Sequence, residues 1–150
     1  MGTAGLTDHS FFHSFYKKLE KDQSNILPID GAPQAVFKLA NSYTLVAVSS
    51  RELFMERETR KWLSKNFKNM FQTLLLVGHI KNAKQTKGEA CVELGARWLI
   101  DDNIDHCKSA AQKGVTPVLF GDYGWHDEFD GSMDYCKDWT AVLEYFDGRN

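Results

Sequence analysis

Two adjacent carboxylates, Asp101 and Asp102, follow a short apolar run, and a helical pattern follows them. Adjacent carboxylates can hold Mg²⁺ directly or through water, because hard divalent cations prefer oxygen ligands. The structural alternative is that Asp102 or Asn103 caps the next helix, with a neighbouring acid that interacts favourably with the helix dipole. The residue types alone leave both interpretations open.

The segments around the acid pair alternate between strand and helix patterns. We expect buried strands at 43–50, 73–79, 97–100 and 116–121. We expect helices at 7–21, 33–40, 51–67, 86–95, 103–114 and 138–146. Strand–helix alternation with short connections indicates an α/β fold, with a Rossmann-like parallel sheet covered by helices on both faces. In such folds ligands bind at the carboxyl ends of the strands.

Three further polar residues belong to this predicted rim. Ser49 and Ser50 end the first of these strands, and their hydroxyls can donate hydrogen bonds to phosphate oxygens. Lys87 begins the helix before the acid pair, where its ammonium could neutralise phosphate charge. The alternatives are that the serines satisfy backbone groups at a strand end and that Lys87 is a solvated first-turn residue.

The ordered segments VAVSSR (46–51) and TKGEACVELGARWLIDD (86–102) resemble the haloacid dehalogenase (HAD) superfamily of phosphohydrolases, in particular its nucleotidase-related branch. The resemblance covers about residues 27–125. It implies that Ser49, the second-motif residue, and Lys87, the third-motif residue, bind phosphate, together with Ser50. It also implies that Asp101 and Asp102, the fourth-motif acids, bind Mg²⁺.

The first motif of this family is a strand ending in a DxD signature. Its first Asp attacks phosphorus to form an aspartyl-phosphate, and its second acts as general acid and base. No apolar run before Ser49 ends in this signature, since Asp8 and Asp22 lie in helical patterns and Asp30 follows the strand-breaking Pro28. We therefore expect no nucleophilic Asp, and a truncated sheet of about four strands that lacks its usual central first strand.

A sheet without its central strand would leave unpaired backbone groups. Either the two flanking strands pair directly, or a partner fills the gap. The partner would be a second copy of the chain, giving a homodimer or larger homo-oligomer, or another protein that completes the sheet. A small phosphorylated molecule is the expected ligand.

These features predict one HAD-like domain over 1–150, with an N-terminal helical segment (1–26), a core (27–125), and a loop with a C-terminal helix (126–150). The favoured function is a non-catalytic binding or regulatory module in which Mg²⁺ binding is weak or lost. The alternative is a Mg²⁺-dependent phosphohydrolase of small phosphorylated metabolites or nucleotides, with an unrecognised nucleophile or one supplied in trans. A structural partner in a larger complex is a third hypothesis.

Composition excludes several other classes of protein. The chain of 150 residues has 18 basic and 20 acidic side chains, a net charge of −2, and therefore no electrostatic reason to bind nucleic acid or an anionic membrane. It has neither a secretory signal pattern nor an apolar run near the roughly 20 residues that a membrane span needs. Cys91, Cys107 and Cys136 are odd in number and lack CxxC spacing, which predicts reduced thiols and an intracellular, cytoplasmic location, with the nucleus also possible.

Two further groups of residues have a structural and a functional interpretation. His9 and His13, spaced i, i+4, could place two metal ligands on one helix face, but no third ligand is evident nearby. The aromatic and acidic segment 120–139 could be a binding loop over the strand rim. We favour the alternative, a surface loop whose aromatic side chains pack on the sheet edge.

Overall fold

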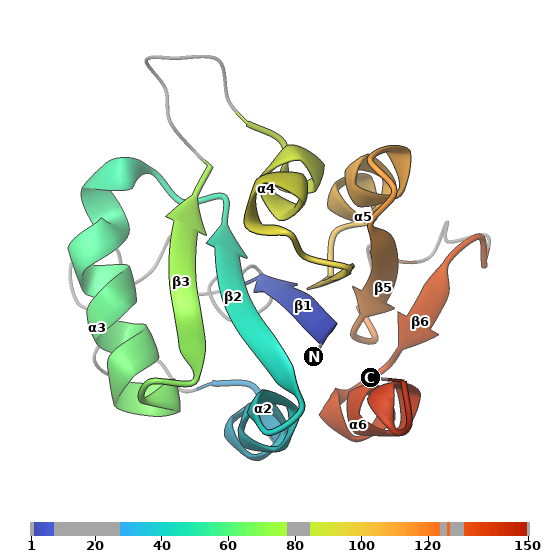
Figure 1. The fold of residues 1–150 in the computed structure, drawn as a ribbon, viewed down its shortest axis with the longest axis horizontal. Helices are drawn as coiled ribbons and strands as arrows, with labels where there is room; N and C mark the ends of the chain where they lie inside the picture. The colour runs from blue at the N-terminus through green and yellow to red at the C-terminus, as the bar shows by residue number, and fades with distance from the viewer. Residues whose placement is uncertain (1, 8–27, 78–84, 124–125, 127–130, 150) are drawn as a thin grey trace.

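The sheet at the centre of the molecule has six parallel strands in the order β3-β2-β1-β4-β5-β6 (Figure 1). The computed structural model describes residues 2–7, 28–77, 85–123, 126 and 131–149. The strands are β1 (Gly2–Thr7), β2 (Tyr43–Ser49), β3 (Phe71–Leu76), β4 (Trp98–Asp101), β5 (Thr116–Phe120) and β6 (Asp134–Cys136). The helices are α2 (Ala32–Ala40), η1 (Leu53–Met55), α3 (Glu56–Phe67), α4 (Lys87–Leu94), α5 (Ile104–Gln112) and α6 (Trp139–Phe146).

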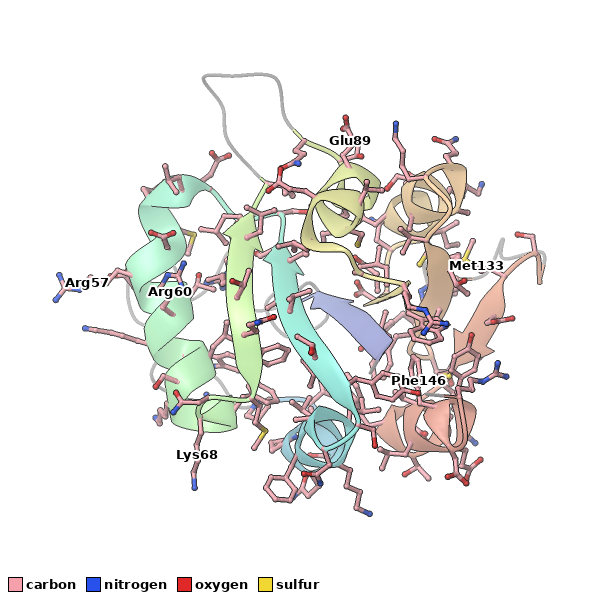
Figure 2. All side chains as sticks on the ribbon, viewed as in Figure 1. Arg57, Arg60, Lys68, Glu89, Met133 and Phe146 are labelled. Carbon is pink, nitrogen blue, oxygen red and sulfur yellow. The ribbon has the colours of Figure 1, made fainter. Side chains whose placement is uncertain are left out.

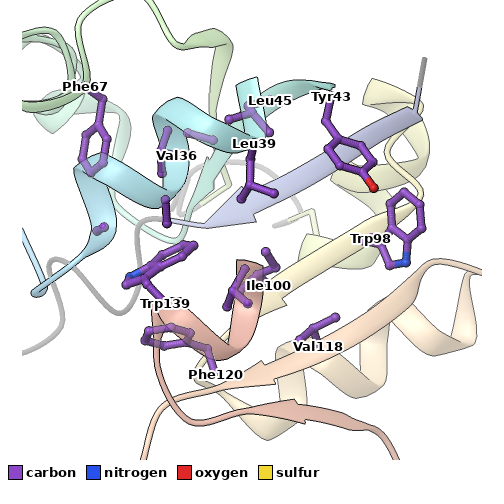
Figure 3. Close-up of a cluster of buried hydrophobic side chains, with 14 of the residues drawn as sticks. Val36, Leu39, Tyr43, Leu45, Phe67, Trp98, Ile100, Val118, Phe120 and Trp139 are labelled. Carbon is purple, nitrogen blue, oxygen red and sulfur yellow. The ribbon is translucent and has the colours of Figure 1, made fainter. Parts of the chain in front are cut away.

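Helices cover both faces of the sheet, which confirms the predicted α/β class. α2, α3 and α6 pack on one face around a large apolar cluster that includes Trp98, Phe120 and Trp139 (Figure 3). α4 and α5 pack on the other face around Cys91, Leu99 and smaller residues. Neighbours along β4 thus alternate between the two clusters, as expected for a strand buried on both faces.

The prediction that the central strand is missing was wrong. β1 lies between β2 and β4 and pairs in parallel with both, from Gly2↔Tyr43 to Thr7↔Val48 on one side and from Ala4↔Trp98 to Leu6↔Ile100 on the other. The segment GTAGLT contains two glycines and only one large apolar residue, so it lacks the apolar run by which a buried strand is recognised. β1 fills the position for which the sequence had left two alternatives, direct pairing of the flanking strands or a partner molecule.

Two other element predictions differ from the structure. The first helix was predicted to begin at Thr7, but Thr7 is the last residue of β1; the rest of that helix, with His9 and His13, lies outside the described residues. β6 was not predicted either, because its three residues are too few to give a strand pattern. Together with β1 it raises the number of strands from about four to six.

α4 and α5 meet at a glycine next to the predicted site lysine. A Cβ on Gly88 would lie 2.3 Å from the Ser109 carbonyl oxygen, so only glycine permits this approach. The Gly88 N–H also donates to Ser109 Oγ at 3.1 Å. The close contact holds the first turn of α4 against the second half of α5.

The three cysteines are free thiols, as predicted from their number and spacing, and all three are buried. Polar side chains such as Arg57, Arg60 and Lys68 project from the outer surface of α3 and the turn after it (Figure 2). Within the described part of the chain, no helix is long and apolar enough to cross a membrane.

Candidate phosphate and metal site

Ser49 is the last residue of β2 and is almost completely buried. Its Oγ accepts a hydrogen bond from the Arg51 backbone N–H at 3.1 Å. The Arg51 guanidinium is buried beside it and donates from Nη1 to Thr59 Oγ1 on α3 at 3.1 Å. Ser50, in contrast, is exposed, so of the two predicted serines only Ser49 lies inside the fold.

Lys87 and Asp101 form a buried ion pair. The Lys87 Nζ lies 2.8 Å from Asp101 Oδ2, and their side chains are 1% and 0% exposed. Lys87 is the first residue of α4, whose N-cap Thr86 forms a reciprocal capping box with Glu89. Lys87 is therefore not a solvated first-turn residue, and the structure brings it together with the predicted acid pair.

The helix after the acid pair is capped by Asn103. Its side-chain oxygen accepts the His106 N–H at 3.0 Å, and Asp101 Oδ1 accepts the Asn103 N–H at 2.9 Å. Of the two predicted capping residues, Asn103 thus takes this role for α5. The carboxylate of Asp102 is not needed for it.

Asp102 is also 1% exposed, one residue beyond the end of β4. Burial, followed by the charge of the neighbouring Asp101, raises the pKa of Asp102 to about 8. Two buried carboxylates next to each other repel, and this repulsion keeps the proton on Asp102 up to a higher pH. A bound cation would favour the ionised form of Asp102, so cation binding at the site would be coupled to loss of that proton.

Two histidines, not predicted as site residues, contact the acid pair. His106 Nδ1 lies 3.2 Å from Asp101 Oδ2. His126 Nε2 lies 2.6 Å from the Asp102 carbonyl oxygen, and its Nδ1 lies 3.1 Å from the Gly121 carbonyl oxygen. The position of His106 in the first turn of α5 was a usable signal, because that turn starts beside the strand end. His126 comes from a distant loop, and no local pattern indicated it.

The end of β1 brings the two halves of the site together. Thr7 pairs with Val48, the residue before Ser49, and Leu6 pairs with Ile100, the residue before Asp101. Ser49 and the acid pair therefore flank the carboxyl end of the central strand. The sequence continues from Thr7 with Asp8, His9 and Ser10, which lie outside the described residues.

The aromatic and acidic segment after β5 is described in part. Trp139 is buried in α6 against Phe120, at a ring-centroid distance of 5.0 Å, and Tyr123 packs partly buried on the same cluster. Tyr135 is 42% exposed, although its hydroxyl donates to the Gly121 carbonyl oxygen at 2.7 Å. Packing on the sheet edge thus holds for Trp139 and Tyr123. The residues Trp125, Asp127, Glu128, Phe129 and Asp130 lie outside the described residues.

The chemistry of these donors fits Mg²⁺. Asp101 and Asp102 offer hard carboxylate oxygens in a buried setting, where a bound cation would compensate the repulsion between them. Among the described residues, no group of three or more His, Cys, Asp or Glu side chains could hold a metal ion. A complete Mg²⁺ site would therefore need waters, substrate oxygens or a ligand from outside the described part of the chain.

Solved structures of a bacterial phosphatase and of HAD-type hydrolases resemble this fold. D,D-heptose 1,7-bisphosphate phosphatase from B. bronchiseptica, complexed with magnesium and phosphate, matches with a TM-score of 0.72 and 14% identity over 100% of both chains. A HAD-superfamily hydrolase from Ehrlichia chaffeensis matches with a TM-score of 0.61 and 20% identity, over 91% of this chain and 71% of that one. A haloacid dehalogenase-like hydrolase from Streptococcus pneumoniae matches with a TM-score of 0.58 and 17% identity, over 75% and 57%.

These similarities show that the chain has the HAD fold. No protein-family model matches the sequence, and no curated protein matches it. The resemblance seen in the sequence motifs and the similarity of the folds agree.

Proposed function

We propose that this chain is a Mg²⁺-dependent phosphohydrolase of small phosphorylated metabolites or nucleotides. The observation that carries the proposal is the position of β1, which occupies the centre of the sheet and ends between Ser49 and the acid pair. The expectation of no nucleophile depended on finding no apolar strand that ends in the DxD signature, and β1 was not recognised as a strand because it has no apolar run. The residue after β1 in the sequence is Asp8, and we assign the nucleophile to it by that position.

The proposed reaction has two steps. An Asp8 carboxylate oxygen attacks phosphorus, the bond from phosphorus to the ester oxygen breaks, and the leaving alkoxide takes up a proton from water. Water then cleaves the aspartyl-phosphate, which releases inorganic phosphate and restores the carboxylate. Ser49 would donate its hydroxyl proton to a phosphate oxygen, and the buried Lys87 ammonium would stabilise the negative charge on the transferred group.

Asp101 and Asp102 are the described residues that would hold Mg²⁺. The bound ion would neutralise charge on the phosphoryl oxygens. The similarity to a phosphatase structure that contains magnesium and phosphate supports this assignment. So does the buried acid pair, because a bound cation would relieve the repulsion between its two carboxylates.

A second candidate function, the non-catalytic binding module, is favoured by one observation in the sequence. Ser10 stands two residues after Asp8, where the family motif has its second Asp, the general acid and base. A serine hydroxyl is far less acidic than a carboxylic acid and transfers protons poorly at neutral pH. The site would then bind phosphate compounds and turn them over slowly or not at all.

The experiment is phosphate release from an aryl phosphate with excess Mg²⁺. It compares the wild type with Asp8→Asn and with the double variant Asp101→Asn/Asp102→Asn. Asp105→Asn, an exposed acid in the first turn of α5, is the matched control. The phosphohydrolase proposal expects turnover that is lost in the first two variants and kept in the control.

Two results would change the proposal. Full turnover by Asp8→Asn would show that another group is the nucleophile. A folded wild type that binds phosphate in a Mg²⁺-dependent manner but releases none from the ester would favour the non-catalytic module.

A further inference from the structure

His106 shares a carboxylate oxygen with the site lysine. Asp101 Oδ2 lies 2.8 Å from Lys87 Nζ and 3.2 Å from His106 Nδ1. An ionised carboxylate only accepts hydrogen bonds, so His106 carries a hydrogen on Nδ1 and donates a hydrogen bond from it to Asp101. Asp101 Oδ1 meanwhile accepts the Asn103 N–H. Three donors thus fix the orientation of this carboxylate.

The main chain of His106 is tied to α4 by a second route. Ser109 Oγ donates to the His106 carbonyl oxygen at 2.8 Å and accepts the Gly88 N–H at 3.1 Å. Gly88 is the neighbour of Lys87 in the sequence. A closed ring of contacts therefore runs from Lys87 through Asp101, His106 and Ser109 to Gly88.

Exposure within the ring is uneven. The side chains of Lys87 and Asp101 are 1% and 0% exposed, whereas that of His106 is 26% exposed. Of the three side chains that meet at Asp101 Oδ2, the imidazole is therefore the one that reaches solvent. Its removal would both delete a donor and admit water to a buried ion pair, whose geometry depends on being enclosed.

We propose that His106 is a positioning residue that holds the Lys87–Asp101 pair, and with it the Lys87 ammonium, in the geometry that binds a substrate phosphate. The claim that this positioning supports phosphate binding rests on the proposed function. The claim that His106 holds the ion pair in place does not. His106 acts through Asp101 and need not touch the substrate.

The first test detects the Lys87 ammonium protons by NMR in the full chain without ligand and measures their exchange with water. His106→Leu removes the donor, His106→Asn offers an amide N–H near the position of Nδ1, and Lys108→Leu is an exposed control on the same helix. We expect exchange to become roughly tenfold faster in His106→Leu, as for loss of one charge-assisted hydrogen bond, and to stay near wild type in the other two. Equal exchange in all four proteins would overturn the proposal.

The second test measures binding of inorganic phosphate by calorimetry with excess Mg²⁺. We expect roughly tenfold weaker binding in His106→Leu, with His106→Asn and Lys108→Leu within about threefold of wild type. A merely structural role would lower the stability of His106→Leu and leave phosphate affinity intact, which contradicts the proposal. If the wild type itself binds no phosphate, the proposed function fails, and the exchange measurement still decides the positioning role. If His106→Leu does not fold, His106→Gln, whose longer side chain displaces the amide N–H, replaces it in both tests.

Discussion

Lys87 occupies a position that is unfavourable for a cation in two respects. It is the first residue of α4, near the positive end of the helix dipole, and its side chain is buried. The ion pair with Asp101 compensates for both. A lysine kept there at such a cost is better explained by use of its charge than by stability, since a buried ion pair is weak evidence for stabilisation.

We predict that breaking this pair from one side destabilises the fold. Asp101→Asn leaves a buried ammonium without its counter-ion and should lower the free energy of unfolding by about 3–5 kcal/mol. The double variant Lys87→Met/Asp101→Asn removes both charges and should recover part of the loss. Urea unfolding of the wild type, Lys87→Met, Asp101→Asn and the double variant gives the coupling energy between the two side chains. A loss below about 1 kcal/mol in Asp101→Asn would mean that the pair is hydrated rather than buried.

At the scale of elements, the contact between α4 and α5 determines whether the ion pair can form. Lys87 comes from one helix, and Asp101 belongs to the strand that leads into the other. Gly88 lets the two helices approach until its own Cα faces the Ser109 carbonyl. The first turns of both helices are fixed separately, by the Thr86 capping box and by the Asn103 cap.

We predict that Gly88→Ala pushes the two helices apart. The added methyl group meets backbone rather than a flexible side chain, so the strain should destabilise the protein by about 1–3 kcal/mol despite the better helix propensity of alanine. The same variant should weaken Mg²⁺-dependent phosphate binding, because Lys87 moves with its helix. Val92→Ala, at a position 54% exposed on the same helix, should change stability by less than about 0.5 kcal/mol. Unchanged stability in Gly88→Ala would show that α4 shifts without strain.

At the scale of the whole molecule, β1 holds the sheet together. It is paired on both edges by strands from the two halves of the chain, β2 on one side and β4 on the other. Because its backbone groups bond to both β2 and β4, replacing β1 by another described strand would require new pairings with both neighbours. The fold therefore depends on six residues that carry little apolar surface.

We predict that Gly5→Pro prevents folding of the sheet. Gly5 pairs with Val46 and with Leu99, and proline at a central strand position removes a ladder hydrogen bond. The expected result is loss of the cooperative thermal transition in circular dichroism. Gly148→Ala, in the C-terminal turn, is the control and should keep that transition. A stable, cooperatively folded Gly5→Pro protein would mean that β2 and β4 can pair directly, which was one of the two alternatives left open by the sequence.

From the buried thiols we predict how the free energy of unfolding changes at alkaline pH. Burial raises the pKa of Cys91 from about 9 to about 11, and burial likewise raises the pKa of Cys136 to about 11. Because the folded-state pKa is the higher one, their contribution to stability is complete below pH 9 and is lost as the pH rises from 9 to 11. The slope is at most about 1.4 kcal/mol per pH unit for each thiol.

Urea unfolding at pH 8, 9 and 10 measures this response. The free energy of unfolding should fall above pH 9, and Cys91→Ala should show a flatter decline than wild type. A decline that is equally steep in Cys91→Ala would assign the pH dependence to other groups.

The local sequence by itself determined most of the elements and pointed to the candidate site residues. Uninterrupted apolar runs with β-branched residues indicated β2 and β4, and the glycine at the end of α4 marked its left-handed C-cap. Ser49, Lys87 and the acid pair became candidates because strand ends and helix starts can be located from local patterns and because their order resembles the HAD motifs. These features depend on neighbours a few residues apart.

Only the tertiary structure decided the centre of the sheet and the environment of the charges. GTAGLT is a strand because β2 and β4 offer backbone partners on both sides, and pairing of that kind leaves no local pattern. The burial of Lys87, the contact of His106 with Asp101 and the arrival of His126 at Asp102 all join residues from different elements. Such contacts depend on how helices and strands pack, and therefore on distances through space that the order of residues does not contain.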